Sequence, residues 1–257
     1  MSANLADRQW PRPRARIGLI IPSVNTLTEP QFFRYAPRDV ELHVTRNRIE
    51  LEKSLIDQLP AILDAASLLA DCGADLIVYH CTGMSMGSGK AQETQMVEAI
   101  RKTTGKPSTS TATAIVTAFR ALGTRKVMLA TPYAQVLNDL EKKFLAEHGV
   151  AVLRDRALDL PVPEGMCGAT PDVWIQTVME MRDPQADAYF LSCTNIQSVD
   201  AIAELEQRLG KPVVTSNQAS LWYALRRCGI GESIAGLGRL LSLPLPREVE
   251  AGQPLAA

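Results

Sequence analysis

The sequence lacks the features that tie a protein to a membrane or a nucleic acid. No apolar run reaches the roughly 20 residues that span a bilayer, and residues 1–16 lack the apolar stretch of a secretory signal. Because 27 Lys and Arg face 28 Asp and Glu, the net charge of -1 gives no field that would attract polyanions. We therefore expect a cytoplasmic protein with no membrane or nucleic-acid partner.

The sequence also lacks closely spaced pairs of cysteines. The 5 cysteines form no CxxC pair and are odd in number, which argues against a disulfide framework or a zinc site. Reduced thiols, no metal and no organic cofactor are the expectation. The 257 residues, 46% of them hydrophobic, are enough for one large domain or two small ones.

Short β-branched runs alternate along the chain with amphipathic stretches of helical length. This order is typical of an α/β protein with parallel sheet, and most of the runs are too apolar to leave one face in water. The expected strands are Arg16–Ile21, Val40–Thr45, Asp75–His80, Lys126–Thr131, Ala151–Arg154, Asp187–Ser192 and Pro212–Ser216. The expected helices are Leu51–Asp71, Lys90–Lys102, Thr113–Leu122, Gln135–His148, Asp172–Arg182, Val199–Leu209 and Ala219–Arg227.

An internal repeat relates the two halves of the chain. Residues 74–83 align with 186–195, which places Cys193 112 positions after Cys81. Upstream, Arg16–Pro22 aligns with Lys126–Pro132, and downstream a Gly-Lys-Pro sequence precedes a short strand in both halves. The repeat predicts two pseudo-symmetric parallel-sheet α/β lobes that arose by internal duplication, with the active site in the cleft between them.

The repeat also sets the expected domain boundaries. We predict an N-terminal arm over residues 1–15, a first α/β lobe over 16–123, a second over 124–231, and a C-terminal helix or tail over 232–257. One lobe is expected to be completed by a chain crossover. The Pro-rich ending from Pro244 is expected to fray or to wrap a partner subunit, so we expect a homo-oligomer.

Cys81 and Cys193 are the predicted catalytic residues. Each follows a strand directly, precedes a threonine and occupies the same place in the repeat. We expect each sulfur to lie at a strand-to-helix turn, where free backbone N–H groups lower a thiol pKa. The alternative interpretation is a pair of core cysteines, because free cysteine is among the most buried residue types. The equivalent positions favour catalysis.

Polar residues near these strand ends are the candidates for substrate binding. Asn25 could donate to a substrate carboxylate, and Tyr133 could donate its phenolic O–H to a carboxylate or enolate oxygen. Asn25 is alternatively a helix cap, and Tyr133 an aromatic residue at a boundary. The predicted substrate-binding residues are Ser23, Asn25, Thr82, Gly83, Tyr133, Thr194 and Asn195.

The remaining candidates are interpreted as structural. His80 precedes Cys81 on a strand, so its ring should point away from the sulfur. Cys72 and Cys228 lie at expected helix ends and are assigned to packing, while Cys167 lies in the loop 161–171, which could act as a lid. Residues 83–90 resemble a phosphate loop in composition but lack the GxxxxGK[ST] spacing, which excludes a nucleotide site of that type.

With these motifs in view, the sequence resembles the aspartate/glutamate racemase superfamily, and within it the branch of maleate cis-trans isomerases and arylmalonate decarboxylases. The resemblance covers Arg16–Gly229 and implies two lobes with the site between them. The matching motifs are Pro22-Ser23-Val24-Asn25-Thr26, Cys81-Thr82-Gly83, Thr131-Pro132-Tyr133 and Ser192-Cys193-Thr194.

The resemblance also bears on the reaction. It implies that Asn25 and Tyr133 hold a substrate carboxylate, and that Cys81 favours an isomerase or racemase, because the decarboxylases have glycine there. Residues 161–171 lack the asparagine that maleate isomerases use in this loop, which leaves the particular acid open.

We therefore predict a cofactor-independent isomerase that acts on a small (di)carboxylic acid through Cys81 and Cys193 and an enediolate-like intermediate. The alternatives are an arylmalonate-type decarboxylase in which Cys193 protonates the enediolate, a racemase of aspartate, glutamate or a hydantoin-like substrate, and a two-lobed carboxylate-binding module without catalysis.

Overall fold

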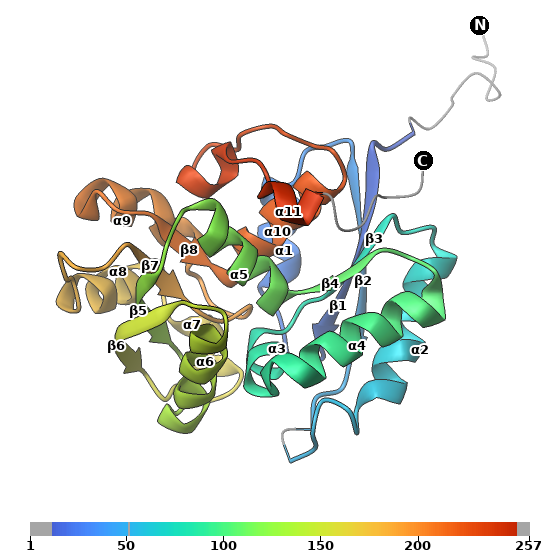
Figure 1. Ribbon diagram of the computed structural model, residues 1–257, viewed down its shortest axis with the longest axis horizontal. Coiled ribbons are helices and arrows are strands. Elements are labelled where there is room, and N and C mark those ends of the chain that lie inside the picture. Colours follow the sequence, from blue (N-terminus) through green and yellow to red (C-terminus); the bar gives the residue numbers. More distant parts are fainter. Residues whose placement is uncertain (1–11, 51, 251–257) are drawn as a thin grey trace, which may run out of the picture.

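Two parallel sheets of four strands each form the frame of the protein (Figure 1). The structure, a computed structural model, describes residues 12–50 and 52–250. The strand orders are β2-β1-β3-β4 and β6-β5-β7-β8. The strands are β1 (Ala15–Pro22), β2 (Val40–Asn47), β3 (Leu76–Tyr79), β4 (Ser108–Ser110), β5 (Lys126–Thr131), β6 (Ala151–Ala157), β7 (Ala188–Leu191) and β8 (Val213–Thr215). Because both sheets have the same order, the predicted α/β class and the duplication are confirmed.

Helices connect the strands and cover the sheets. The α-helices are α1 (Thr28–Tyr35), α2 (Leu59–Asp71), α3 (Thr82–Gly87), α4 (Gly89–Thr104), α5 (Thr111–Ala121), α6 (Gln135–Glu147), α7 (Glu164–Gly168), α8 (Pro171–Glu180), α9 (Ile202–Leu209), α10 (Ser216–Arg227) and α11 (Arg247–Glu250). Short 3₁₀ helices cover η2 (Val199–Ala201) and η3 (Arg239–Ser242). The central strands β3 and β7 are buried along their whole length, as their apolar sequences predict.

The helix expected from Leu51 begins instead at Leu59. Ser54 and Asp57 form a local turn, in which the Ser54 hydroxyl donates to the Asp57 carboxylate over 2.7 Å. Pro60 follows in the first turn of α2, where its missing N–H is tolerated. The start of this helix is therefore set by the turn chemistry before the proline, and the apolar periodicity overestimated its length.

The two lobes share one hydrophobic core. Helix α10 packs against α5 and also contacts β3 and α1 of the first lobe, and α5 contacts β8 of the second. Both helices lie in the middle of the molecule between the sheets (Figure 1). Buried residues of both lobes, including Leu19, Phe119, Leu129 and Trp222, belong to one continuous cluster. Apolar packing therefore joins the two lobes.

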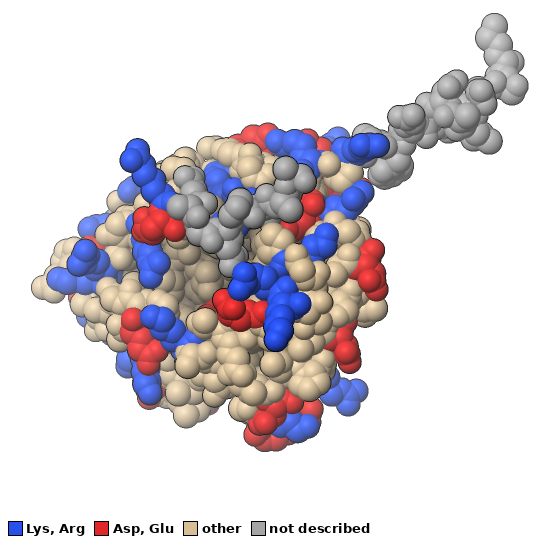
Figure 2. Space-filling view, turned by 45° about the vertical axis from the view of Figure 1, so that its right-hand side comes forward, with Lys and Arg blue, Asp and Glu red and all other residues tan. Residues whose placement is uncertain are grey.

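An ion-pair cluster lies just before the start of β1. The Arg14 guanidinium lies 2.6 Å from the carboxylates of both Asp39 and Glu232, which holds the start of β1 against the segment after the second lobe. Positive and negative side chains are intermixed over the face shown in Figure 2. Among the described residues, no helix is long and apolar enough to cross a membrane. Most of the predicted arm and the last residues of the tail, 1–11 and 251–257, lie outside the described part.

Candidate active site

A cavity of about 760 Å³ lies between the lobes, at the carboxyl ends of the strands. This is the edge where open α/β sheets bind ligands. All nine residues predicted for the site line this cavity: Ser23, Asn25, Cys81, Thr82, Gly83, Tyr133, Cys193, Thr194 and Asn195. The structure therefore brings the predicted residues together, while the role of each in a reaction stays a prediction.

Cys81 lies two residues after the end of β3, at the N-cap of α3, with an extended backbone. Its side chain is buried, and burial raises the pKa of the thiol to about 12. Backbone N–H groups of Met84 and Gly83 act in the opposite direction. The expected strand-to-helix turn is therefore present.

Cys193 occupies the corresponding place after β7. A bend over residues 194–197 follows it in place of the expected helix, and the backbone N–H of Asn195 donates to the sulfur over 3.2 Å. Burial raises the pKa of this thiol to about 11, while the Tyr133 hydroxyl, which donates to the sulfur, lowers it. The bend thus supplies the backbone donor that a helix start was expected to supply.

The expected lowering of the two thiol pKa values is wrong. Removing a sulfur from water disfavours its thiolate more than the nearby N–H groups favour it, so both pKa values are raised. A thiolate at either cysteine would also disfavour a thiolate at the other, since Cys193 contributes to the raised pKa of Cys81. At neutral pH both residues are thiols, and ionisation of one makes ionisation of the other less favourable.

The other predictions about histidine and cysteine have mixed outcomes. His80 points away from Cys81, as expected: its Nε2–H donates to Asn217 Oδ1 over 2.8 Å, and burial lowers its pKa to about 4. Cys72 is exposed at the end of α2, so its assignment to packing is wrong. Cys228, at the end of α10, is partly buried.

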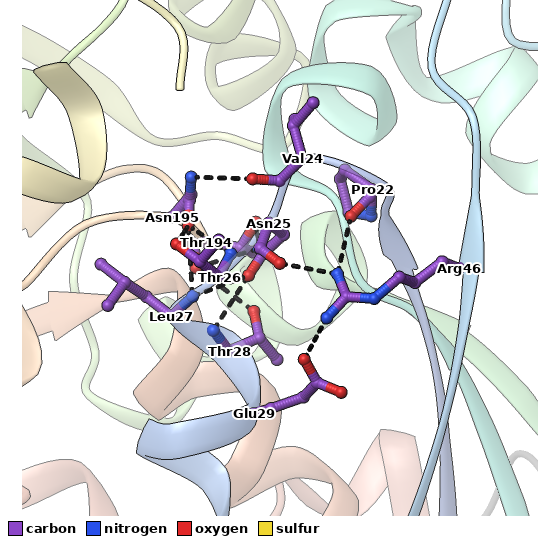
Figure 3. A network of polar contacts seen from close by, with 10 residues as sticks. All are labelled: Pro22, Val24, Asn25, Thr26, Leu27, Thr28, Glu29, Arg46, Thr194 and Asn195. Atoms are coloured by element: carbon purple, nitrogen blue, oxygen red, sulfur yellow. Dashed lines mark hydrogen bonds and ion pairs between the residues drawn. The ribbon is translucent and has the colours of Figure 1, made fainter. Parts of the chain in front are cut away.

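Asn25 and Asn195 tie the first lobe to the second (Figure 3). The Asn25 amide donates to the carbonyl and hydroxyl of Thr194 over 3.2 and 3.1 Å, and its oxygen accepts from the Thr28 N–H at the start of α1. The Asn195 oxygen accepts from the Thr26 and Leu27 N–H groups. The Asn25 oxygen thus closes the turn that leads into α1, whose N-cap is Leu27, and the Asn25 donors are already used within the protein.

Arg46 on β2 fixes the turn that carries Asn25. Its guanidinium donates to the Asn25 carbonyl over 2.6 Å and forms an ion pair with Glu29 on α1 (Figure 3). The turn is thus held from β2 as well as from the second lobe.

Ser216 and Asn217 lie next to the predicted site residues, although no sequence motif pointed to them. The Thr82 hydroxyl donates to Ser216 Oγ over 2.9 Å, and Ser216 Oγ accepts the backbone N–H of Cys193 over 3.1 Å. Both residues directly follow β8. The strand-end rule that selected the two cysteines could therefore have found them, because it applies equally to β8.

One wall of the cavity is apolar and was not predicted. It consists of Val24, Ile49, Met84, Leu137, Leu140, Leu160, Val162 and Met166. Val162 and Met166 come from the loop 161–171, whose Cys167 carbonyl accepts from Gln197 over 2.8 Å. Helix α3 approaches α6 so closely here that a Cβ at Gly83 would lie 3.3 Å from Leu137. Glycine at this position therefore permits the close packing that narrows the cavity.

Comparison with known proteins agrees with this arrangement. A family model described as arylmalonate decarboxylase matches residues 46–241. The arylmalonate decarboxylase of Bordetella bronchiseptica is 34% identical over 185 residues, which cover 71% of this chain and 77% of that protein. The chain belongs to the arylmalonate decarboxylase family.

The chain is also similar to maleate isomerases. The Pseudomonas putida maleate isomerase is 28% identical over 242 residues, covering 88% of this chain and 97% of that protein. A crystal structure of a maleate isomerase from P. putida S16 with maleate superposes with a TM-score of 0.83 at 26% identity, over 89% of this chain and 97% of that one. The suspected branch of the superfamily is therefore confirmed, and the protein is an enzyme of that branch.

Proposed function

We propose that this enzyme is a cofactor-independent cis-trans isomerase of a small unsaturated carboxylic acid such as maleate. The observation that carries the proposal is the placement of Cys81 and Cys193 at equivalent strand ends in one cavity. A pair of thiols on two sides of a bound acid can supply a nucleophile and a proton donor without a cofactor.

Cys81 first loses its thiol proton to solvent. The reaction begins when the resulting Cys81 thiolate forms a C–S bond to one alkene carbon. The π electrons move towards the adjacent carboxylate, which becomes enediolate-like, and the former double bond rotates as a single bond. The electrons then return, the double bond re-forms in the trans geometry and the C–S bond breaks to release the thiolate. The Cys193 thiol faces the intermediate, where it can lend its proton to carbon and take it back.

Two hydroxyl groups are placed to stabilise the enediolate charge. The Tyr133 O–H borders the cavity and reaches Cys193. Because Thr194 Oγ accepts from Asn25, its own hydrogen can turn towards a substrate oxygen. Donors aimed at a developing oxyanion in a water-poor site are each worth about 3 kcal/mol.

Decarboxylation of a malonate with an apolar substituent is the second candidate. The apolar wall favours it, because a four-carbon diacid offers no surface to pack there, and because that wall can expel carbon dioxide from a carboxylate. In this reaction Cys193 protonates the enediolate and Cys81 is dispensable. The 34% identity to the Bordetella arylmalonate decarboxylase also supports it.

Proton NMR in D₂O separates these reactions. The enzyme is incubated with maleate, an arylmalonate, and both enantiomers of aspartate and glutamate. Fumarate formation supports the isomerase, loss of a carboxylate the decarboxylase, and exchange at Cα with loss of chirality a racemase. Cys81→Ser should abolish isomerisation, and Cys72→Ser, at the exposed end of α2, is the matched control. Full isomerase turnover in Cys81→Ser would contradict the proposed addition step.

A further inference from the structure

Glu141 on α6 is a buried carboxyl group that the proposed mechanism does not use. It is 0% exposed, and neither carboxyl oxygen has a hydrogen-bond partner among the described residues. On α6 it shares the buried face with Asn138, Phe144 and Leu145, so it points into the protein and away from water. An ionisable side chain in such a place is expensive to keep unless it serves the site.

The charge of Glu141 reaches the reacting groups. As a carboxylate it acts on Cys81, Cys193 and Tyr133, and in each case it disfavours the anionic form. The Ser192 hydroxyl, which precedes Cys193, lies near enough to favour the Glu141 carboxylate, although the two do not meet at hydrogen-bonding geometry.

The other charged residues near α6 interact with partners other than Glu141. From β6, Asp155 pairs with Lys142 over 2.9 Å, and from α4, Lys90 acts on His148 at the far end of the helix. Glu93 on α4 accepts hydrogen bonds from Thr113 and Ser110. Helix α3 carries no ionisable side chain, and no cation contributes to the Glu141 environment. Cys81, Cys193 and Tyr133 are therefore the ionisable groups coupled to Glu141.

We propose that Glu141 is a positioning residue for the cysteine pair: its acid form permits a thiolate in the cavity, and its ionised form opposes one. The reason is Coulombic, since two like charges in a buried site raise each other's free energy. A neutral carboxylic acid fills the same space without that repulsion. Glu141 thereby sets an upper pH limit to thiolate formation at both cysteines.

The order of the pKa values supports this limit. Burial raises the pKa of Glu141 to about 8, so the group is an acid at neutral pH. The thiols, with pKa values of about 12 and 11, gain thiolate steadily as the pH rises. Above pH 8 the ionising Glu141 works against this gain. The consequence for turnover rests on the proposed thiolate function, whereas the effect on thiol reactivity does not.

Site-resolved alkylation tests the proposal without substrate. Wild type and Glu141→Gln are treated with iodoacetamide between about pH 6 and 10, and the rates at Cys81 and Cys193 are followed by mass spectrometry. Glutamine keeps the shape of the neutral acid but cannot ionise. In wild type the plot of log rate against pH should flatten above pH 8, while in Glu141→Gln it should continue to rise. At pH 9 the variant cysteines should react about three- to tenfold faster.

Two further variants control the result. Glu147→Gln removes the same charge from an exposed position on α6 and should follow wild type. Glu141→Leu is neutral and apolar, so it should behave like Glu141→Gln and serves if the glutamine variant fails to fold. Parallel profiles in wild type and either Glu141 variant overturn the proposal. If the NMR assay finds no isomerase activity but the profiles differ as expected, the coupling stands and only the proposed function fails.

Discussion

At the scale of single residues, the chemistry depends on how a buried thiol is helped to ionise. Cys193 receives an O–H donor from Tyr133 and an N–H donor from Asn195, whereas Cys81 receives backbone N–H groups only. Side-chain donation to a charged group is worth about 1.5–3 kcal/mol. The Tyr133 hydroxyl therefore acts against the effect of burial on the pKa of Cys193.

Tyr133→Phe should therefore raise the pKa of Cys193 and slow turnover. Loss of the hydroxyl removes one donor to the sulfur and one to the enediolate, so we expect kcat to fall by about 10- to 100-fold. Steady-state kinetics with the substrate found by NMR measures the change. Tyr223→Phe, a buried tyrosine outside the cavity lining, should keep kcat within about twofold. Equal losses in the two variants would show that the Tyr133 effect is only structural.

Glu141 should also make the stability of the protein depend on pH. Its pKa rises from an ordinary 4.5 to about 8 on folding, so the folded state binds the proton more tightly. This contribution is fully present below pH 4.5 and is lost as the pH rises to about 8. The Tm of wild type relative to Glu141→Gln should therefore fall between pH 5 and 8, by roughly 2–4 °C for each kcal/mol. A constant Tm difference over this range would contradict the buried, raised-pKa carboxyl.

At the scale of elements, two strand-to-helix junctions repeat between the lobes and carry side-chain caps. Ser110 accepts from the Thr113 N–H at the start of α5, and Thr215 forms a capping box with Gln218 at the start of α10. Both helices pack at the centre of the molecule, and most residues of their first turns are buried. Caps here satisfy donors that nothing else can reach.

Thr215→Ala should consequently destabilise the protein by about 1–3 kcal/mol, because a buried N–H loses its acceptor. Urea unfolding followed by circular dichroism measures the loss. Thr170→Ala is the matched control, since Thr170 precedes α8 without a side-chain cap bond. It should change the free energy of unfolding by no more than about 0.5 kcal/mol. A similar loss in both variants would remove the capping box as the cause.

The elements that the sequence predicts well are those whose own residues carry a clear hydrophobic pattern. Buried strands such as β5 (Lys126–Thr131) follow from apolar runs, and its predicted bounds agree with the structure. Helix α3 (Thr82–Gly87) could not be predicted from its own sequence, because six residues with two glycines do not form a stable helix alone. It forms because its glycines let it pack closely on Leu137 of α6. That contact depends on tertiary structure.

At the scale of the whole molecule, the docking of the lobes determines which residues meet in the site. The repeat predicts each lobe and the cleft, so both cysteines and their neighbours could be found in the sequence. Asn25 meets Thr194 across 169 positions, and no local pattern specifies that contact. Glu141 gives a weak signal, a charged residue on the apolar face of α6, whose meaning depends on the position of both cysteines.

The lobes should unfold as one unit because buried polar contacts and a shared core join them. Asn217 on α10 accepts from His80 of the first lobe and donates to the Thr194 carbonyl over 3.1 Å. Asn217→Ala leaves the buried His80 Nε2–H without its acceptor and removes one of the donors to the Thr194 carbonyl, so we expect a loss of about 1–3 kcal/mol. Unfolding should remain one transition, with tryptophan fluorescence and circular dichroism coincident.

Arg34→Ala is the matched control for the buried contact between the lobes. Arg34 also joins the lobes, through an exposed ion pair with Asp200 at 3.1 Å, but such pairs contribute only about 0–1 kcal/mol. We therefore expect its urea midpoint to stay close to that of wild type while that of Asn217→Ala falls clearly. Two separate transitions in Asn217→Ala would contradict unfolding as one unit, whereas equal midpoints in the two variants would show that the lobes are held by their apolar core alone. The polar contacts around the cavity would then serve to position the site residues and would contribute little to the stability of the fold.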